Sequence, residues 1–503
     1  MNINRMRSDI DPFSAKITKL FKNSLVYGLT SSLQSILGFV LLPILTIYYT
    51  PEIFGVYSLL LLLSALSSAI FYLGASSALG RFYLEENSDL YKNKIFTTSL
   101  IITLIGAFLL ISLGLIFEKP LSISLFETDK YHLPVKLILI ATSFGFLLNL
   151  MTLLLRYENK ASLFFIIIIS GILVNFIITY SLLSKFNYGI LAPIYGVLIS
   201  NALLFFILIL IKIKNLTKKL EVDHFKLILS FGTQSSIAGL SFYLLEWIDR
   251  LIINELLNLN DVGIYSLGYK LGAIINILIV VPFSLVWGPM RMQYAKSEAL
   301  PSYTVKVVSY YTLIGVFVLS VTILFGEDIL KIFFTNKSYA NSVLIVPIIM
   351  FSLFFYGYQN IIDFGIYINN KIYYYTVIAA VLILVNVGLN FWLLPSFGYQ
   401  AAAYVTLFTY FLSSSIIYLV SSFYYPIKIE FTRVFSALIT IPILYYLVNF
   451  SGGLNFSIRI IIALTISLMF YTLWLNKTER AYMVQGIKKS LNTKKWILIN
   501  PIF

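Results

Sequence analysis

The sequence predicts an all-α protein that crosses a membrane about fourteen times, and three observations lead to this fold class. Of the 503 residues, 59% are hydrophobic and 12% are charged, whereas an ordinary soluble domain carries about 25% charged residues. The apolar residues form runs of about 20 residues, the helix length that crosses the ~30 Å hydrocarbon core of a bilayer. These runs lack the alternating pattern of a β-barrel, so helices are the expected spanning elements.

The spanning windows are separated by short loops, so no soluble domain is predicted between them. The longest predicted outer loop is about 118–134. We therefore expect the protein to act within the membrane. The predicted spans are residues 22–48, 54–78, 95–117, 135–155, 161–184, 188–212, 226–257, 261–288, 303–325, 341–369, 372–394, 398–422, 432–450 and 456–475.

The positions of the basic residues predict how the chain is oriented. With the N-terminus on the cytoplasmic side, 27 of the 36 lysines and arginines fall in inner segments and seven in outer segments, while Arg250 and Lys270 lie inside spans. This is the positive-inside bias of a membrane protein. We attribute the net charge of +14 to topology and to anionic lipid, and not to a nucleic-acid partner. Both termini are expected to be cytoplasmic.

Two stretches of the first spans recur about 200 residues later. Gly28–Leu33 (GLTSSL) resembles Gly232–Ile237 (GTQSSI), and Phe54–Leu59 (FGVYSL) resembles Val262–Leu267 (VGIYSL). Six spans separate the copies, so both copies have the same orientation in the membrane. A parallel repeat of this kind, with a pseudo-twofold axis along the membrane normal, is a known plan of transporters. Chance similarity between apolar helices is the alternative explanation.

The repeat divides the chain into two lobes of six helices with two helices appended. The six basic residues in 477–495 predict a tail that lies on anionic lipid. The predicted segments are a basic N-terminus (1–21), an N-terminal lobe (22–213), an inter-lobe loop (214–225), a C-terminal lobe (226–422), two further helices (423–475) and a basic tail (476–503).

Several segments resemble the bacterial polysaccharide-biosynthesis flippases, the O-antigen or Wzx-type exporters. They are Pro51–Leu59, Ala78–Tyr83, Asp249–Arg250, Asp261–Lys270 and Trp287–Pro289. The resemblance covers roughly residues 22–422. It implies the two-lobe, MATE-like fold of the multidrug, oligosaccharidyl-lipid and polysaccharide exporter superfamily, with alternating access between the lobes. It also implies a location in the bacterial inner membrane. The implied cargo is a polyprenyl-diphosphate-linked oligosaccharide (an O-antigen, capsule or exopolysaccharide repeat unit) that moves from the cytoplasmic to the outer leaflet.

Four charged residues inside the predicted spans are candidates for the site. Glu246, Asp249 and Arg250 lie in one span and Lys270 in the next, where each charge costs about 2.5–3.5 kcal/mol on insertion scales. Glu246 and Arg250 have the favourable spacing for an ion pair along a helix, and Asp249 could meet Lys270. In a functional interpretation, Arg250 and Lys270 contact diphosphate or acidic sugar, and the carboxylates of Glu246 and Asp249 serve ion coupling. In a structural interpretation, the four form a neutral cluster that holds two helices together.

Arg81, Arg291 and Asp363 complete the candidate residues. Arg81 and Arg291 lie at corresponding inner ends of the second and eighth spans. A guanidinium binds phosphate through two parallel hydrogen bonds, so this pair could receive the diphosphate, or it could serve only as positive-inside anchors. Asp363 is the one carboxylate in its span and predicts either a proton or sodium site or a structural hydrogen bond.

The sequence gives no sign of enzyme chemistry. It has no cysteine, its two histidines, His132 and His224, are expected to lie apart from each other in loops, and no acid–base pair is found. We expect no enzyme activity, no cofactor and no metal site. A cation-coupled drug or metabolite antiporter of the same superfamily is the alternative function, followed by a membrane polysaccharide polymerase. The expected partners are the lipid-linked cargo, membrane lipid, H⁺ or Na⁺, and a polysaccharide polymerase or export machinery, without nucleic acid.

Overall fold

Helices make up every regular element in the part of the chain that the computed structural model describes, which confirms the all-α prediction. Twelve of these helices are long and apolar enough to cross a membrane, and they match twelve of the fourteen predicted windows. The described residues are 30, 33–34, 38–217, 221–293, 300–333, 336–369, 371, 373–427, 429–450, 455–475 and 479–480.

The two remaining windows differ in how much of them is described. Window 226–257 coincides with α9 (Val222–Leu256), a continuous helix of 35 residues. Of window 22–48, the described end forms a short apolar helix, Gly38–Tyr48. The predictions for 1–21, for the tail beyond Arg480 and for most of the GLTSSL copy lie outside the described residues, so the count of fourteen spans stays a prediction.

The chain forms two compact units, divided by packing contacts and not by the sequence repeat, so the predicted lobe boundaries stay a prediction. The first unit comprises Met1–Leu271, Phe334–Ile345 and Ile372–Thr409, and the second comprises Gly272–Phe333, Val346–Lys371 and Tyr410–Phe503. Helices α10 and α16 each contribute to both.

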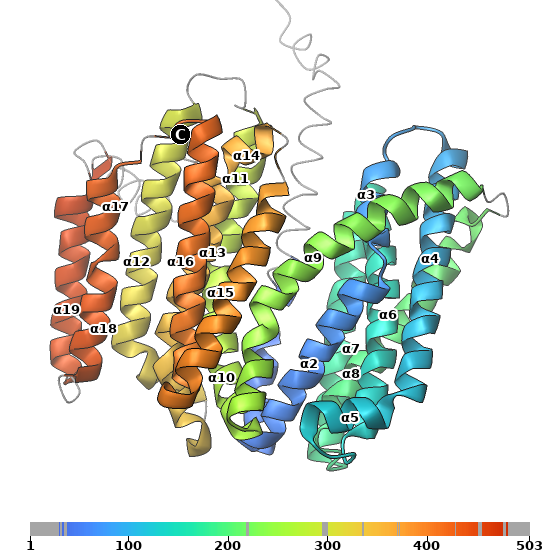
Figure 1. Cartoon of the computed structure of the whole chain (residues 1–503), viewed down its shortest axis with the longest axis horizontal. Coiled ribbons are helices and arrows are strands. Elements are labelled where there is room, and N and C mark those ends of the chain that lie inside the picture. Colours follow the sequence, from blue (N-terminus) through green and yellow to red (C-terminus); the bar gives the residue numbers. More distant parts are fainter. Residues whose placement is uncertain are drawn as a thin grey trace, which may run out of the picture. The chain divides into compact units, whose positions relative to one another are not determined.

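The first unit is built around α6 and α9 (Figure 1). Helix α6 packs against α4 and α8, and α9 packs against α2, α3 and α15. Its elements are α2 (Pro51–Phe71), α3 (Ala75–Phe82), α4 (Asp89–Ile116), α5 (Glu118–Phe126), α6 (His132–Tyr157), α7 (Ala161–Ser184), α8 (Leu191–Lys212), η2 (Ile213–Asn215), α9, α10 (Leu259–Gly272), η4 (Lys337–Ile345), α15 (Tyr373–Phe397) and the first part of α16 (Tyr399–Tyr424).

The first turn of α2 follows directly from its sequence. Thr50 precedes the helix in an extended conformation, and its hydroxyl oxygen accepts a hydrogen bond from the Ile53 backbone N–H at 3.4 Å. Pro51 occupies the first helical position, where its missing N–H would have no intrahelical partner. Glu52 adds a negative charge where the helix dipole favours it. These three residues fix the start of the first copy of the repeat.

The two copies of the repeat meet at Gly55 and Gly263. A Cβ atom on Gly55 would collide with the carbonyl oxygen of Leu259, and one on Gly263 would collide with the carbonyl oxygen of Pro51. Pro51 and Leu259 are related by the same offset of 208 residues as the two glycines. Such reciprocal contact is the pattern of a twofold-related pair. Only glycine lets the first turns of α2 and α10 approach this closely.

The second unit is arranged around α12, which packs against α13, α17, α18 and α19 (Figure 1). Within it the Tyr311 hydroxyl donates a hydrogen bond to the Phe354 carbonyl at 2.9 Å. Its elements are the π-helical turn η3 (Asn276–Val280), α11 (Val281–Gln293), α12 (Leu300–Phe333), α13 (Val346–Ile362), α14 (Phe364–Ile368), the rest of α16, α17 (Phe431–Leu438), α18 (Thr440–Phe450), α19 (Phe456–Met469) and the π-helical turn η5 (Phe470–Trp474).

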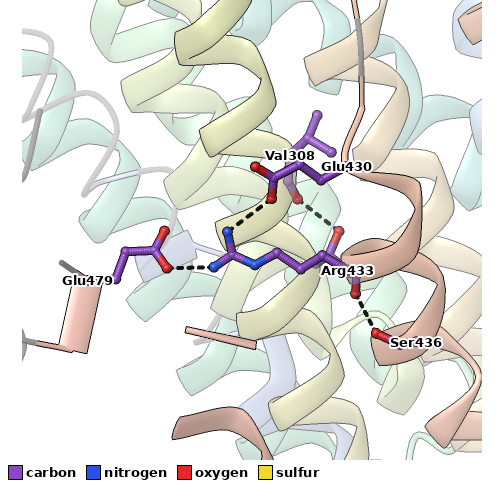
Figure 2. Close-up of polar contacts among 6 residues, drawn as sticks. Val308, Glu430, Arg433, Ser436 and Glu479 are labelled. Atoms are coloured by element: carbon purple, nitrogen blue, oxygen red, sulfur yellow. Dashed lines mark hydrogen bonds and ion pairs between the residues drawn. The ribbon is translucent and has the colours of Figure 1, made fainter. Parts of the chain in front are cut away.

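Ion pairs hold the C-terminal helices of this unit. Arg433 of α17 donates to Glu430 at 3.2 Å and to Glu479 at 2.8 Å, and Figure 2 shows its guanidinium between the two carboxylates. Arg459 of α19 pairs with Asp328 of α12 at 2.7 Å. The appended helices are therefore tied to α12 and to each other through charged side chains as well as apolar packing.

Candidate functional site

Asp249 lies at the centre of a buried polar cluster in the first unit. Its carboxylate is fully buried. Oδ2 accepts hydrogen bonds from the Tyr265 and Thr406 hydroxyls, both at 2.7 Å, and Oδ1 accepts one from the Asn390 amide at 3.0 Å. The Asn390 amide also donates to Asn386 Oδ1 at 2.9 Å. Helices α9, α10, α15 and α16 thus each supply part of the cluster.

The hydrogen-bond partners of Asp249 are all neutral, and the positive charge of Arg250 acts on the carboxylate from nearby without forming an ion pair. A buried carboxylate is costly unless a cation or a proton compensates it. In addition, the buried Oδ1 of Asn390 has no hydrogen-bond partner among the described residues. Carboxylate, amide and hydroxyl oxygens are the ligands that hard cations prefer. The cluster is therefore chemically suited to a proton or to a small cation such as Na⁺.

Arg250 is buried beside this cluster and faces aromatic rings. Its guanidinium carbon lies 4.4 Å from the ring centres of Trp247 and Tyr269 and 5.7 Å from that of Tyr265. Nη1 donates to the backbone carbonyl of Glu246 at 2.9 Å. The expected side-chain ion pair with Glu246 is wrong for the described structure, because Arg250 turns to its own helix backbone and the Glu246 side chain is exposed.

Lys270 also faces aromatic rings instead of a carboxylate. Its ammonium nitrogen lies 5.3 Å from the ring centres of both Phe54 and Tyr57 on α2. The suggested contact between Asp249 and Lys270 is not formed in the described structure, because Lys270 is directed at the rings of α2 and makes no ion pair with Asp249. The described structure contains no ion pair that involves Arg250 or Lys270. The four charges do not form the mutually paired cluster that sequence spacing suggested.

Arg291 and Asp363 form an ion pair in the second unit. Arg291 Nη1 also donates to the Asn360 carbonyl at 3.1 Å, and the guanidinium lies 5.2 Å from the Tyr367 ring centre. Asp363 is therefore not the isolated carboxylate that its span suggested. Sequence spacing could not reveal the pairing because 72 residues separate the two side chains.

Arg81 lies in the last turn of α3, in the first unit. Its side chain is exposed, and no hydrogen bond or ion pair connects it to another described residue. Its predicted counterpart Arg291, by contrast, is paired with Asp363. The repeat-related arginines thus differ in their surroundings.

Sequence reasoning missed the neutral donors around Asp249. Asn386 and Asn390 stand four residues apart in an otherwise apolar span, and this spacing places two amides on one helix face. That signal was present in the sequence. The contribution of Tyr265 and Thr406 was not, because hydroxyl residues are frequent in these helices and the pattern does not distinguish the ones that meet a carboxylate.

Comparison with known proteins identifies the family of the chain and solved structures with a similar fold. A family model described as polysaccharide biosynthesis protein matches residues 20–295. The structure of the lipid II flippase MurJ in an inward closed conformation is 18% identical, with a TM-score of 0.73 over 90% of this chain and 98% of that chain. No curated protein matches the sequence.

Two structures of a multidrug resistance MATE family transporter of the MOP superfamily are also similar. The inward-facing one is 14% identical, with a TM-score of 0.61 over 84% of this chain and 94% of that chain. The outward-facing one is 13% identical, with a TM-score of 0.60 over 83% of this chain and 96% of that chain. At these identities the similarity establishes the fold, and it confirms the predicted MATE-like architecture.

Proposed function

Because the chain belongs to the polysaccharide biosynthesis protein family, we propose that it moves a polyprenyl-diphosphate-linked oligosaccharide across the bacterial inner membrane. The cargo would pass from the cytoplasmic to the outer leaflet by alternating access, without covalent chemistry. The fold shared with membrane transporters supports this proposal. The expected orientation has both termini in the cytoplasm.

The observation that carries the proposal is a pair of cations, Arg250 and Lys270, that form no ion pair with a described carboxylate. Arg250 and Lys270 contact aromatic faces and a carbonyl, which compensate a positive charge only in part: a cation–π contact contributes about 0.5–2 kcal/mol. An anionic cargo would supply the missing counter-charge. Lys270, which is only half-buried, is the residue we assign to direct contact with the diphosphate. Arg250 is buried against aromatic rings and would attract the anionic cargo through its positive charge without touching it.

Arg81 and Arg291 are proposed to receive the diphosphate head group on the cytoplasmic side. The exposed Arg81 has no described partner and is ready to bind an anion. Arg291 is already paired with Asp363, so it could bind phosphate only by exchanging or sharing that carboxylate. We therefore expect Arg81 to make the first contact and Arg291 to act when the Asp363 pair opens.

Asp249 is proposed as the ion-coupling residue. The neutral donors around it and the unpartnered Asn390 oxygen support binding of H⁺ or Na⁺, because no described lysine or arginine forms an ion pair with this carboxylate. Glu246 is exposed, and Asp363 is already paired with Arg291, so both are weaker candidates for this role. A cation at Asp249 would contact residues from four helices and could thereby favour one arrangement of them.

The Asp249 cluster would serve a cation-coupled drug or metabolite antiporter equally well, so this remains the second candidate function. The two functions differ in their cargo. The substrates of a drug antiporter are often cationic. A site for such substrates would not need Arg250 and Lys270, two positive charges that form no ion pair with a described carboxylate.

The proposed function is tested by removing the gene from the host. We expect surface polysaccharide to disappear and its lipid-linked precursor to accumulate on the cytoplasmic side. Restoring the gene with Lys270→Ala or Arg250→Ala should give protein that inserts normally but exports poorly. For Lys270, which we assign to direct contact with the diphosphate, the loss of a hydrogen bond to a charged group should weaken binding by roughly 10- to 100-fold.

Lys226→Ala serves as the control, because Lys226 is an exposed lysine near the start of α9. It should restore full export. Normal surface polysaccharide in the deletion strain, together with altered drug sensitivity, would support the antiporter instead. Normal export by both the Lys270 and the Arg250 variants would remove these residues from the cargo site.

A further inference from the structure

A polar pocket lies between the start of α3 and the last turns of α6 in the first unit. Its volume is about 310 Å³, at the lower end of the range for small-molecule sites. None of the residues discussed as candidates above lines it. The lining residues are Ser76, Ser77, Asn149, Thr152, Leu153, Arg156 and Tyr157.

The pocket combines one positive charge with several neutral hydrogen-bonding groups. Asn149, Thr152 and Arg156 follow one another at three- and four-residue intervals, so α6 presents them on a single face. Asn149 Oδ1 accepts a hydrogen bond from the Tyr72 hydroxyl at 3.1 Å, which orients the amide and leaves its N–H₂ group as a donor. The Ser76 and Ser77 hydroxyls come from the facing helix.

Aromatic rings hold the charged end of the pocket in place. The Arg156 guanidinium lies 4.6 Å from the Phe164 ring centre, and Tyr157 stacks on Tyr83 with ring centres 5.9 Å apart. Tyr72 stacks on Phe146 at 5.4 Å. Side chains restrained in this way lose little conformational freedom when a ligand binds.

We propose that this pocket binds an acidic sugar residue of the cargo, with Arg156 pairing with the sugar carboxylate. The inference rests on the proposed function and names a feature of its substrate. A guanidinium binds a carboxylate through two parallel hydrogen bonds, while the amide and hydroxyl groups match the several hydroxyls of a sugar. A diphosphate carries more negative charge than the single cation of this lining would balance.

The experiment measures binding of three lipids to the purified full-length protein in nanodiscs of neutral phospholipid. The probes are undecaprenyl diphosphate, the same lipid carrying glucose, and the same lipid carrying glucuronic acid. Wild-type protein should bind the glucuronic acid form most tightly. Arg156→Gln should weaken binding of that form by roughly 10- to 100-fold and leave binding of undecaprenyl diphosphate unchanged. Lys226→Gln, the matched loss of charge elsewhere in the unit, should alter none of the three.

Thr152→Val removes a lining hydroxyl at nearly constant volume and keeps the test valid if Arg156→Gln does not fold. It should weaken binding of both sugar-bearing lipids several-fold and spare the bare diphosphate. Equal wild-type affinity for the glucose and glucuronic acid forms would overturn the inference while the proposed function stands. So would displacement of the glucuronic acid form by phosphatidylglycerol, which would identify an anionic lipid site. Failure of wild-type protein to bind any of the three lipids would instead overturn the proposed function.

Discussion

Asp249 shows how a carboxylate can be accommodated in an apolar helix bundle without an ion pair to arginine or lysine among the described residues. Two hydroxyls and an amide satisfy its oxygens, and they come from helices α10, α15 and α16. The stability of this arrangement depends on what neutralises the charge. A site whose occupant is a mobile cation would make the packing of these helices depend on the ion.

We predict that Asp249→Asn removes ion dependence while preserving the fold. The asparagine keeps the size and much of the hydrogen-bonding capacity of the aspartate but lacks its charge. Transport into proteoliposomes should lose its stimulation by Na⁺ or by a proton gradient, an effect of order tenfold for a coupling of about 1.4 kcal/mol. Asp261→Asn is the control, because Asp261 pairs with Asn258 at the start of α10. A variant at Asp249 that still responds to the ion would rule out this residue as the coupling site.

The sequence located the charged residues of the site but not their partners. The cost of placing a charge in a membrane singled out Asp249, Arg250 and Lys270. Helical spacing predicts which residues share a face of one helix, yet the donors to Asp249 lie up to 157 residues away. The opposite charges were expected to pair with one another. Instead, neutral donors bind the carboxylate of Asp249, and aromatic rings contact Arg250 and Lys270. Tertiary packing, which a single sequence does not specify, decided the outcome.

At the scale of helices, the crossing of α2 and α10 gives the sequence repeat a structural meaning. The matching motifs predicted two related helices, and the structure adds that their first turns touch, backbone to backbone, at Gly55 and Gly263. The existence and order of the twelve apolar helices were predicted correctly, since runs of about 20 apolar residues define them directly, while their ends differ from the prediction by up to seven residues. The sequence contains no comparable pattern from which the contact between Gly55 and Gly263 could have been predicted.

We predict that Gly55→Ala and Gly263→Ala each destabilise the protein by about 1–3 kcal/mol, the usual cost of overpacking. Each added methyl group would meet a backbone carbonyl, which cannot move as a side chain can. The measurement is the thermal unfolding midpoint of purified protein in detergent. The double variant should lose less than the sum of the two, because both substitutions open the same contact.

Gly388→Ala provides the control for this series. Gly388 lies within α15 and would have no atom within 4 Å of an added Cβ. Alanine has the higher helix propensity, so this variant should be neutral or slightly stabilising. Unchanged midpoints for both crossing variants would show that α2 and α10 are not in close contact in the membrane.

At the scale of the whole molecule, the orientation of the spans is open to direct measurement. The distribution of basic residues predicts that Tyr188 faces the outside and Lys214 the cytoplasm, with the single apolar helix α8 (Leu191–Lys212) between them. Since the chain has no cysteine, a cysteine introduced at either position would be its only thiol. In intact cells, a membrane-impermeant maleimide should label Tyr188→Cys and not Lys214→Cys. Equal labelling of both would refute the predicted helix count between them.

The two ion pairs of Arg433 can form only at different stages of the synthesis of the protein. Glu430 precedes Arg433 by three residues, so the first carboxylate is present as soon as the arginine has been made. Glu479 follows 46 residues later, after the last two apolar spans. The second ion pair can form only when both spans have left the ribosome. A nascent chain that stalls before residue 479 would therefore enter the membrane without the ion pair between Arg433 and Glu479, and quality-control proteases could recognise it in that state.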